Sequence, residues 1–506
     1  MAALGLPDFT YIMEKDLERG NNCPGDEKAL SSSSRPSRSN SAKSEPGTLE
    51  TNPVSSRMPS LSSRKASTTS MSRQGLIQNG EERHKMSWWQ AATVMLAETV
   101  SLGILSLPSA VKSVGLVPGS ILILGAGVVT TYTGYEVYRF KARYPQIRSF
   151  AEAGQLIGGS VGRWVVEIMQ MAMLVFMMAG HIIIFRSMAF KLFSDHICGV
   201  WWTLLALGAE DELLVLDLLY VRGYTMRKHG LMSIIACISI IAATFTAMGS
   251  VIQASHHESI EYDTVVQLGT DGYTFAAACA AVSNILVSFS GHIAYFNIID
   301  EMRKPSDFPK ALLTTNFFTI ALYALAGLII YRYVGTSVLS PALDSATETA
   351  AKIAYGLAIP TIVVAGVIAA LVAAKRAYDI TWQRRPEVKD ENTARAWTSW
   401  IAIVVTLWTV AWIVGNVIPW FSSLLAVIGA AVGTWICLGF PAIFWLYGSW
   451  REKDGWEGWR KKVLVWVNVT LFLLCLVASA LGLYGSVVDI ASQSGSTRPF
   501  PCSSVD

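Results

Sequence analysis

The chain has 506 residues, of which 52% are hydrophobic and only 15% are charged. A typical soluble domain carries roughly 25% charged residues, so this composition excludes an ordinary soluble enzyme and a disordered scaffold. The net charge is +3, and no basic stripe is interleaved with aromatic residues, which argues against a nucleic-acid partner. The apolar residues gather in runs of about twenty, the length at which a helix spans a bilayer. We therefore predict an all-α polytopic membrane protein that contacts the lipid bilayer.

Residues 1–86 differ from the rest, being rich in Ser, Pro, Arg and Lys and nearly devoid of aromatic residues. Such a segment cannot bury enough apolar surface to offset the entropy lost on ordering, so we predict a disordered cytoplasmic tail. Within it, Arg64–Ser67 (Arg-Lys-Ala-Ser) is a basic-directed phosphorylation motif, which makes a kinase a candidate partner. An unmodified polar tail is the alternative. Residues 87–487 form the predicted transmembrane domain, and 488–506 a short extracellular C-terminal tail.

Eleven apolar segments follow the tail, joined by loops too short for a soluble catalytic domain. They cover approximately 90–111, 117–139, 163–185, 200–221, 231–253, 274–298, 311–334, 351–374, 397–418, 421–447 and 463–487.

The distribution of Lys and Arg predicts the orientation of these spans. With the N-terminus in the cytoplasm, the cytoplasmic side carries 34 of the 40 basic residues, which favours N-inside, C-outside and an odd number of spans. The segment 200–221 fits badly, because four acidic residues between 210 and 217 would each cost about 2.5–3.5 kcal/mol near the bilayer centre. A gene-model error around 205–228 and a functional acidic helix are the two interpretations.

The cysteines and the N-terminus carry few signals. Seven cysteines are scattered without a CxxC pair, so the sequence signals neither a disulfide framework nor a zinc site. No metal site and no other cofactor is expected. The N-terminus has no charged start followed by an apolar core, so no cleavable signal peptide is predicted.

Small and polar residues interrupt two of the predicted spans. The first span carries Gly103 and, one turn later, Pro108, and the sixth span carries the run Ser288–Gly291. These spans begin two nearly equal halves of five spans, and interruptions at matching positions point to a transporter binding site. We predict that helix one unwinds near Ser101–Gly103 and helix six near Ser288–Gly291. The alternative is that Gly103 and Gly291 permit close helix packing.

Two unwound turns would suit a zwitterion such as an amino acid. Free N–H groups at the N-terminus of a half-helix bind a carboxylate, and free carbonyls at the opposite end bind an ammonium group. Phe289 is expected near the substrate side chain or as a gate. The predicted substrate-binding residues are Ser101, Leu102, Gly103 and Ile104 for the carboxylate, and Ser288, Phe289, Ser290 and Gly291 for the ammonium group.

The same residues resemble a known family. Glu98–Pro108 (Glu-Thr-Val-Ser-Leu-Gly-Ile-Leu-Ser-Leu-Pro) is similar to the first-span signature of the amino acid/auxin permease family. Ser288–Ala294 and Glu301–Ala311 resemble the stretches in and after its sixth span, the latter with the pattern Glu-Met-x-x-Pro-x-x-Phe-x-x-Ala. The resemblance covers about 87–487 and is closest to fungal neutral amino acid permeases. It implies a leucine-transporter-type fold of eleven helices, an inverted five-plus-five repeat plus one, and secondary active transport.

The resemblance also bears on the coupling ion. Sodium-coupled animal members place an Asn where this chain has Ala97, which implies proton coupling rather than sodium coupling. Glu98 is an ionisable group inside a span and is the first proton-coupling candidate. His292 is the second, because an imidazole titrates near neutrality. Packing roles are the alternatives: a hydrogen-bonded Glu98 carboxylate, and a neutral His292 bonded to a freed carbonyl. Glu167 is expected to face the bundle near its cytoplasmic end.

These inferences predict a transporter and not an enzyme. No metalloprotease motif, nucleophile elbow or pair of intramembrane aspartates is present, so no catalytic residue is assigned. We predict a proton-coupled importer of neutral amino acids in the plasma membrane. Two alternatives are a vacuolar exporter of the same fold and a transport-inactive nutrient receptor that signals through its tail.

Overall fold

The computed structural model describes most of the chain beyond the N-terminal tail. The described residues are 86–193, 197–208, 226–258, 274–383, 385, 394–451, 458–494 and 499–502. The predicted disordered tail with its phosphorylation motif lies outside them, as does the acidic stretch at 209–225.

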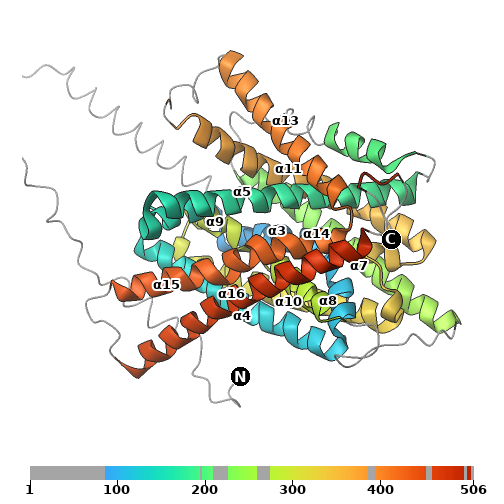
Figure 1. The fold of residues 1–506 in the computed structure, drawn as a ribbon, viewed down its shortest axis with the longest axis horizontal. Coiled ribbons are helices and arrows are strands. Elements are labelled where there is room, and N and C mark those ends of the chain that lie inside the picture. The colour runs from blue at the N-terminus through green and yellow to red at the C-terminus, as the bar shows by residue number, and fades with distance from the viewer. Residues whose placement is uncertain are drawn as a thin grey trace, which may run out of the picture. The chain divides into compact units, whose positions relative to one another are not determined.

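Ten helical segments among these residues are long and apolar enough to cross a membrane (Figure 1). The first half of the chain supplies α3 (Trp88–Val114), α4 (Leu116–Arg143), α5 (Phe150–Leu192) and α7 (Met226–Glu258). The second half supplies α8 (Phe275–Ser288), α9 (Tyr295–Glu301), α10 (Phe308–Val334), α11 (Glu348–Thr381), α13 (Ala394–Val417), α14 (Phe421–Ile428), α15 (Phe440–Trp450) and α16 (Trp459–Gln493). Short 3₁₀ or π turns are η2 (Gly291–Ala294), η3 (Pro305–Asp307), η4 (Gly335–Ser337), η5 (Ala342–Ser345), η6 (Gly429–Gly433) and η7 (Trp435–Gly439).

The predicted all-α polytopic architecture is confirmed. A shorter apolar helix, Gly199–Gly208, covers the start of the fourth predicted span, and the ten long segments account for the other ten. The sixth span is made of α8, η2 and α9, and the tenth of α14, η6, η7 and α15. The last span, α16, continues to Gln493, a few residues beyond its predicted end.

The packing of the helices repeats between the two halves. Helix one (α3) packs on helix seven (α10), and helix six (α8 and α9) packs on helix two (α4). Helix five (α7) packs on helix eight (α11), and helix ten (α14) packs on helix three (α5). Helices one and six also pack on each other. Exchanging corresponding helices therefore reproduces the contacts, as the five-plus-five repeat predicts.

Helix one lies inside the bundle. Residues 99–108 are all buried, and ten successive buried residues cover every side of a helix that has 3.6 residues per turn. Helix six is similarly enclosed, with all of residues 283–290 buried. The two interrupted spans of the sequence are thus the ones that neighbouring helices surround.

One end of helix six is joined to the chain segment just before helix one. The Met86 N–H donates to the Glu301 carbonyl at 2.8 Å, and the Arg303 N–H donates to the Met86 carbonyl at 2.7 Å. At the same end, the Lys141 ammonium of α4 lies 2.7 Å from an Asp300 carboxylate oxygen of α9. These contacts hold helices one, two and six together at this end of the bundle.

Candidate functional site

Helix six is broken at the predicted place. The α-helix ends at Ser288, and a 3₁₀ turn over Gly291–Ala294 leads into α9. Between them the Ser290 N–H donates to the Val287 carbonyl at 3.0 Å and the Gly291 N–H to the Phe289 carbonyl at 3.0 Å. These tighter bonds replace the regular i to i−4 pattern, so the interruption expected near Ser288–Gly291 is confirmed.

Helix one is not broken. The α-helix runs without interruption from Trp88 to Val114, so the unwound turn predicted near Ser101–Gly103 is wrong for this structure. Pro108 is accommodated within it, and the Ser106 hydroxyl donates to the Gly103 carbonyl at 2.9 Å. A continuous helix satisfies its own backbone groups, which a buried span requires. The N–H groups of Ser101–Ile104 therefore belong to the helix here.

Gly103 and Gly291 both lie where helices one and six approach closely. A Cβ placed on Gly103 would be 2.5 Å from the Tyr323 hydroxyl oxygen and 2.9 Å from Ser288 Cβ. A Cβ on Gly291 would be 2.5 Å from the Thr99 hydroxyl oxygen. The alternative of close-packing glycines thus holds for Gly103, while Gly291 combines close packing with the break.

The other predicted binding residues divide between this contact and its surroundings. The Ser101 hydroxyl is buried and has no hydrogen-bond partner among the described residues. Leu102 extends toward α5, where its Cδ1 would lie 2.9 Å from a Cβ placed on Gly180. Ile104 is buried in the core, the Ser290 hydroxyl donates to the Val287 carbonyl, and Phe289 packs in the helix-six turn.

Tyr323 of α10 joins the two helices, and the sequence analysis missed it. Its buried hydroxyl lies 2.6 Å from the Thr99 carbonyl of helix one and 2.7 Å from the Ser288 carbonyl of helix six. The Tyr323 hydroxyl has one proton to donate. In a regular helix the N–H four residues later would donate to the Ser288 carbonyl, and the break removes this donor, so we assign the Tyr323 proton to the Ser288 carbonyl. The rings of Phe289 and Tyr323 also meet edge to face, 5.0 Å between centroids. The predicted span 311–334 contains three tyrosines, and nothing in its sequence distinguishes Tyr323 from the other two.

The two candidate proton carriers differ in their surroundings. Glu98 is half-buried on helix one and forms no hydrogen bond or ion pair with any described residue. His292 is fully buried in η2, and its Nε2 lies 3.0 Å from the Thr133 hydroxyl of α4. That hydroxyl is within hydrogen-bond distance of the Val129 and Thr130 carbonyls of its own helix, so it can donate there and accept from His292.

Glu167 faces the bundle as predicted. Its carboxylate is buried and accepts a two-point hydrogen bond from the Arg376 guanidinium, which links α5 to α11. A buried charge paired in this way has a structural explanation of its own. Glu167 is therefore not assigned to the site.

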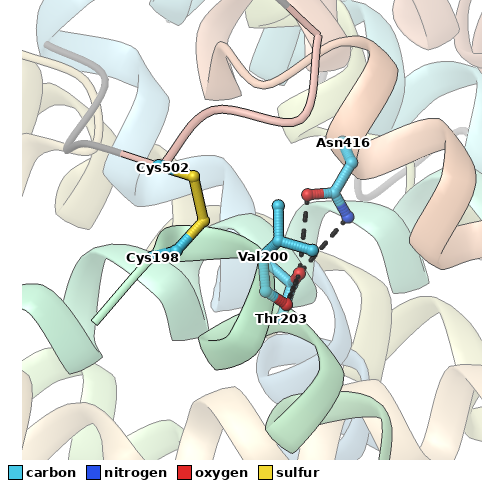
Figure 2. The surroundings of a disulfide bond; sticks show 5 residues. All are labelled: Cys198, Val200, Thr203, Asn416 and Cys502. Carbon is cyan, nitrogen blue, oxygen red and sulfur yellow. Dashed lines mark hydrogen bonds between the residues drawn. A yellow bond between two sulfur atoms is a disulfide. The ribbon is translucent and has the colours of Figure 1, made fainter.

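A disulfide joins Cys198 to Cys502, which are 304 positions apart (Figure 2). The Gly199 N–H donates to the Cys502 carbonyl at 3.0 Å, and the Phe500 N–H donates to the Asn416 carbonyl at 2.9 Å. The segment 499–502 is thus tied to both the 199–208 helix and α13. This corrects the sequence analysis, which found no disulfide signal because spacing motifs register only cysteines close together in the chain.

Known proteins match this chain over most of its length. The transmembrane amino acid transporter protein family matches residues 84–485. The N amino acid transport system protein of Neurospora crassa is 27% identical, over 83% of this chain and 88% of its own length. A transmembrane transporter of Fusarium pseudograminearum is 28% identical, over 89% of this chain and 92% of its own.

More distant matches include a plant protein and a solved structure. The amino acid transporter AVT1E of Arabidopsis thaliana is 20% identical, over 87% of this chain and 80% of its own length. The structure of a Na⁺-coupled sialic acid symporter aligns with a TM-score of 0.46 at 10% identity, over 83% of this chain and 92% of that one. The sequence relatives are transporters and not enzymes, as predicted. The family match runs from just before α3 into α16, and the chain belongs to the transmembrane amino acid transporter family.

Proposed function

We propose that this chain is a proton-coupled importer of neutral amino acids that works by alternating access. The observation that carries the proposal is the break in helix six, which lies directly against helix one in a member of an amino acid transporter family. Such a break places free backbone groups inside the membrane, where they are tolerated only beside a cavity or a partner. Substrate is the partner that we assign to it.

The proposed binding residues are Ser101–Ile104 on helix one and Ser288–Gly291 on helix six. The close approach of Gly103 to Ser288 is here called the closed contact. In it, the Tyr323 hydroxyl is hydrogen-bonded to the Ser288 carbonyl, the group that we assign to the substrate ammonium. The buried Ser101 hydroxyl without a partner is a group that a polar ligand would satisfy. Substrate binding then requires Gly103 and Ser288 to separate, and a role for helix-one N–H groups requires local unwinding as they do.

Glu98 is the proposed proton carrier. It lies five residues, about 7 Å along the helix, before Gly103. A half-buried carboxylate without a hydrogen-bond partner has no packing role that explains its presence in a span, and intramembrane charges are functional by default. His292 is held by Thr133 and is the second candidate. Sodium coupling is disfavoured because the side chain of Ala97 offers no oxygen ligand.

The proposed orientation places the C-terminus outside the cytoplasm and the protein in the plasma membrane. Disulfides persist in oxidising compartments, so the end of the bundle that carries Cys198 and Cys502 is assigned to the outside. The distribution of basic residues favours the same orientation.

Cysteine labelling tests this orientation. In intact cells, a membrane-impermeant maleimide should label the chain after mild reduction only if Cys198 and Cys502 are present. Labelling of Cys23 should require permeabilised cells, and the reverse pattern would overturn the orientation.

Uptake of radiolabelled amino acids tests the function. Cells that express the chain should accumulate members of a panel of alanine, leucine and glutamine faster than vector controls, and more so at pH 5.5 than at about 7.5. Absence of uptake from a chain located at the cell surface would contradict the importer. A fluorescent tag that locates it in the vacuolar membrane would favour the exporter. A signalling phenotype without flux, lost on removal of residues 1–80, would favour the receptor.

A further inference from the structure

A cavity of about 230 Å³ opens at the end of the bundle opposite the Met86 contact. It lies between the end of helix one, the start of helix six, the start of α14 and the end of α16. An apolar cavity of about 150 Å³ is sufficient for benzene, so this one has room for a small or medium amino acid. It is at the same end as the disulfide, because the Asn416 carbonyl that holds Phe500 lies four residues before Trp420 in its wall.

The wall of this cavity carries one charge of each sign. Lys112 comes from helix one and Asp489 from α16, and both side chains are half-buried. The Lys112 ammonium donates to the Val338 carbonyl at 3.1 Å, and the Asp489 carboxylate accepts from the Ser423 hydroxyl at 2.6 Å. Neither forms an ion pair with any described residue. Each charge loses hydration at this depth without a counter-charge from the protein, and a zwitterion would supply both.

Polar side chains connect the cavity to the break in helix six. In its wall, the hydroxyl oxygens of Ser109 and Ser422 lie 3.3 Å apart. The Asn284 side-chain amide donates to the Ser422 hydroxyl at 2.9 Å, and the Asn284 backbone carbonyl accepts from the Ser288 hydroxyl at 2.8 Å. The cavity therefore ends about one and a half helical turns from the closed contact between Gly103 and Ser288, with Asn284 between them.

We propose that this cavity is an outer docking site for a zwitterionic amino acid. Lys112 binds the substrate carboxylate, Asp489 binds the ammonium group, and the small side chains of Ala277, Ala280 and Ala281 accommodate an uncharged side chain. From here the substrate passes Asn284 and reaches the site between helices one and six. This inference rests on the proposed function and adds a second position, with its own charge selectivity, on the outer side.

The test compares charge-neutral variants with L-leucine as the transported probe. Lys112→Gln and Asp489→Asn should each raise the KM for leucine about tenfold, the effect of losing a hydrogen bond to a charged group, with the maximal rate retained. Lys352→Gln is the matched control, because Lys352 pairs with Glu348 at the start of α11 and does not line the cavity. Surface biotinylation corrects each rate for expression.

Charge selectivity separates a binding role from a structural one. Leucinamide lacks the carboxylate, so Lys112→Gln should weaken competition by leucine but not by leucinamide. N-acetyl-leucine lacks the ammonium group, so Asp489→Asn should reduce the preference for leucine over it, and the central site should retain the remainder. A merely structural defect would change all competitors alike. Unchanged KM and unchanged selectivity in both variants, in a wild type that transports leucine, would overturn the docking site alone. A wild type without uptake would instead refute the proposed function.

A second measurement does not depend on the charged variants. Ser113 lines the cavity and is half-buried, so a Ser113→Cys thiol should react with an impermeant methanethiosulfonate reagent from outside. Leucine should slow this reaction, and leucinamide should slow it less. A reaction rate that leucine leaves unchanged at concentrations that saturate uptake would contradict occupancy of the cavity.

Discussion

At the scale of single residues, the contact between helices one and six depends on the absence of a side chain at Gly103. Ser288 Cβ and the Tyr323 hydroxyl occupy the space that a Cβ there would need. Tyr323 in turn satisfies the carbonyl that the break exposes. The contact is therefore complementary in both shape and hydrogen bonding, and it closes the space where substrate is proposed to bind.

Replacing Gly103 should block this contact. Gly103→Leu should abolish uptake while the chain still reaches the membrane, and Gly103→Ala should lower stability by about 1–3 kcal/mol through overpacking. Gly125→Ala is a suitable control, because a Cβ at Gly125 meets no atom within 4 Å. Uptake normalised to surface expression and thermal unfolding in detergent are the measurements. Normal uptake by Gly103→Leu would show that the contact opens too widely for its size to matter.

Glu98 offers a prediction about coupling. Glu98→Gln keeps the shape and hydrogen-bonding capacity of the side chain but removes its titration. We expect this variant to bind substrate and to exchange internal for external substrate, but to lose accumulation driven by a pH gradient. Counterflow and net uptake in proteoliposomes distinguish the two activities. If Glu98→Gln still concentrates substrate with unchanged pH dependence, the carboxyl group is structural, and His292→Gln becomes the next variant for the same assay.

At the scale of elements, the C-terminal segment acts as a strap at one end of the bundle. Residues 499–502 reach from α16 to the 199–208 helix through the disulfide, and to α13 through the Phe500 backbone and a ring contact with Trp412. The Asn416 side chain adds a 3.3 Å hydrogen bond to Thr203 (Figure 2). The strap connects helices four, nine and eleven and does not contact the closed contact between Gly103 and Ser288.

Breaking the strap should therefore affect stability more than binding. Cys198→Ser and Cys502→Ser should each lower the thermal midpoint by a similar amount, and the double variant should add nothing further, because either substitution removes the same bond. The KM for substrate should stay within about twofold of wild type, a change of roughly 0.4 kcal/mol. Additive destabilisation by the two variants would contradict a shared bond.

At the scale of the whole molecule, the two ends of helices one and six differ. One end is joined by the backbone bonds of Met86 to Glu301 and Arg303, and the other opens into the cavity that Lys112 and Asp489 line. The proposed alternating-access cycle exchanges these two states, so we expect the Met86 contact to break when the opposite end closes. In that proposed cycle, the structure corresponds to the state that is closed at the Met86 end.

The proposed coupling to protons belongs to this whole cycle. Lowering the external pH from about 7.5 to about 5.5 raises the external proton concentration a hundredfold, so inward symport should speed up and accumulate more substrate. Replacing sodium by choline at constant pH should have little effect. Uptake in vesicles with imposed pH or sodium gradients provides the measurement, and a strict sodium requirement would overturn the proton assignment.

Much of this architecture could be predicted from the sequence because its signals are local. Each span is a run of apolar residues, and the placement of Lys and Arg predicts a common orientation without knowledge of the packing. The break in helix six was also predictable, since Ser288, Ser290 and Gly291 have lower helix propensity than most residues and cluster within a single turn. The stretches around Glu98 and Glu301 likewise indicate the family, because each motif is contiguous in the chain.

Other features were decided only by the tertiary structure, because they depend on neighbours that are distant in the chain. Gly103 and Pro108 weaken a helix in isolation, yet helix one stays continuous because surrounding helices bury it and its backbone must remain bonded. Tyr323 gains its role only where α10 crosses the break, and Cys198 meets Cys502 only when the C-terminus returns to α13. Sequence patterns register the preference of each segment, whereas packing determines which of these preferences the folded chain can satisfy.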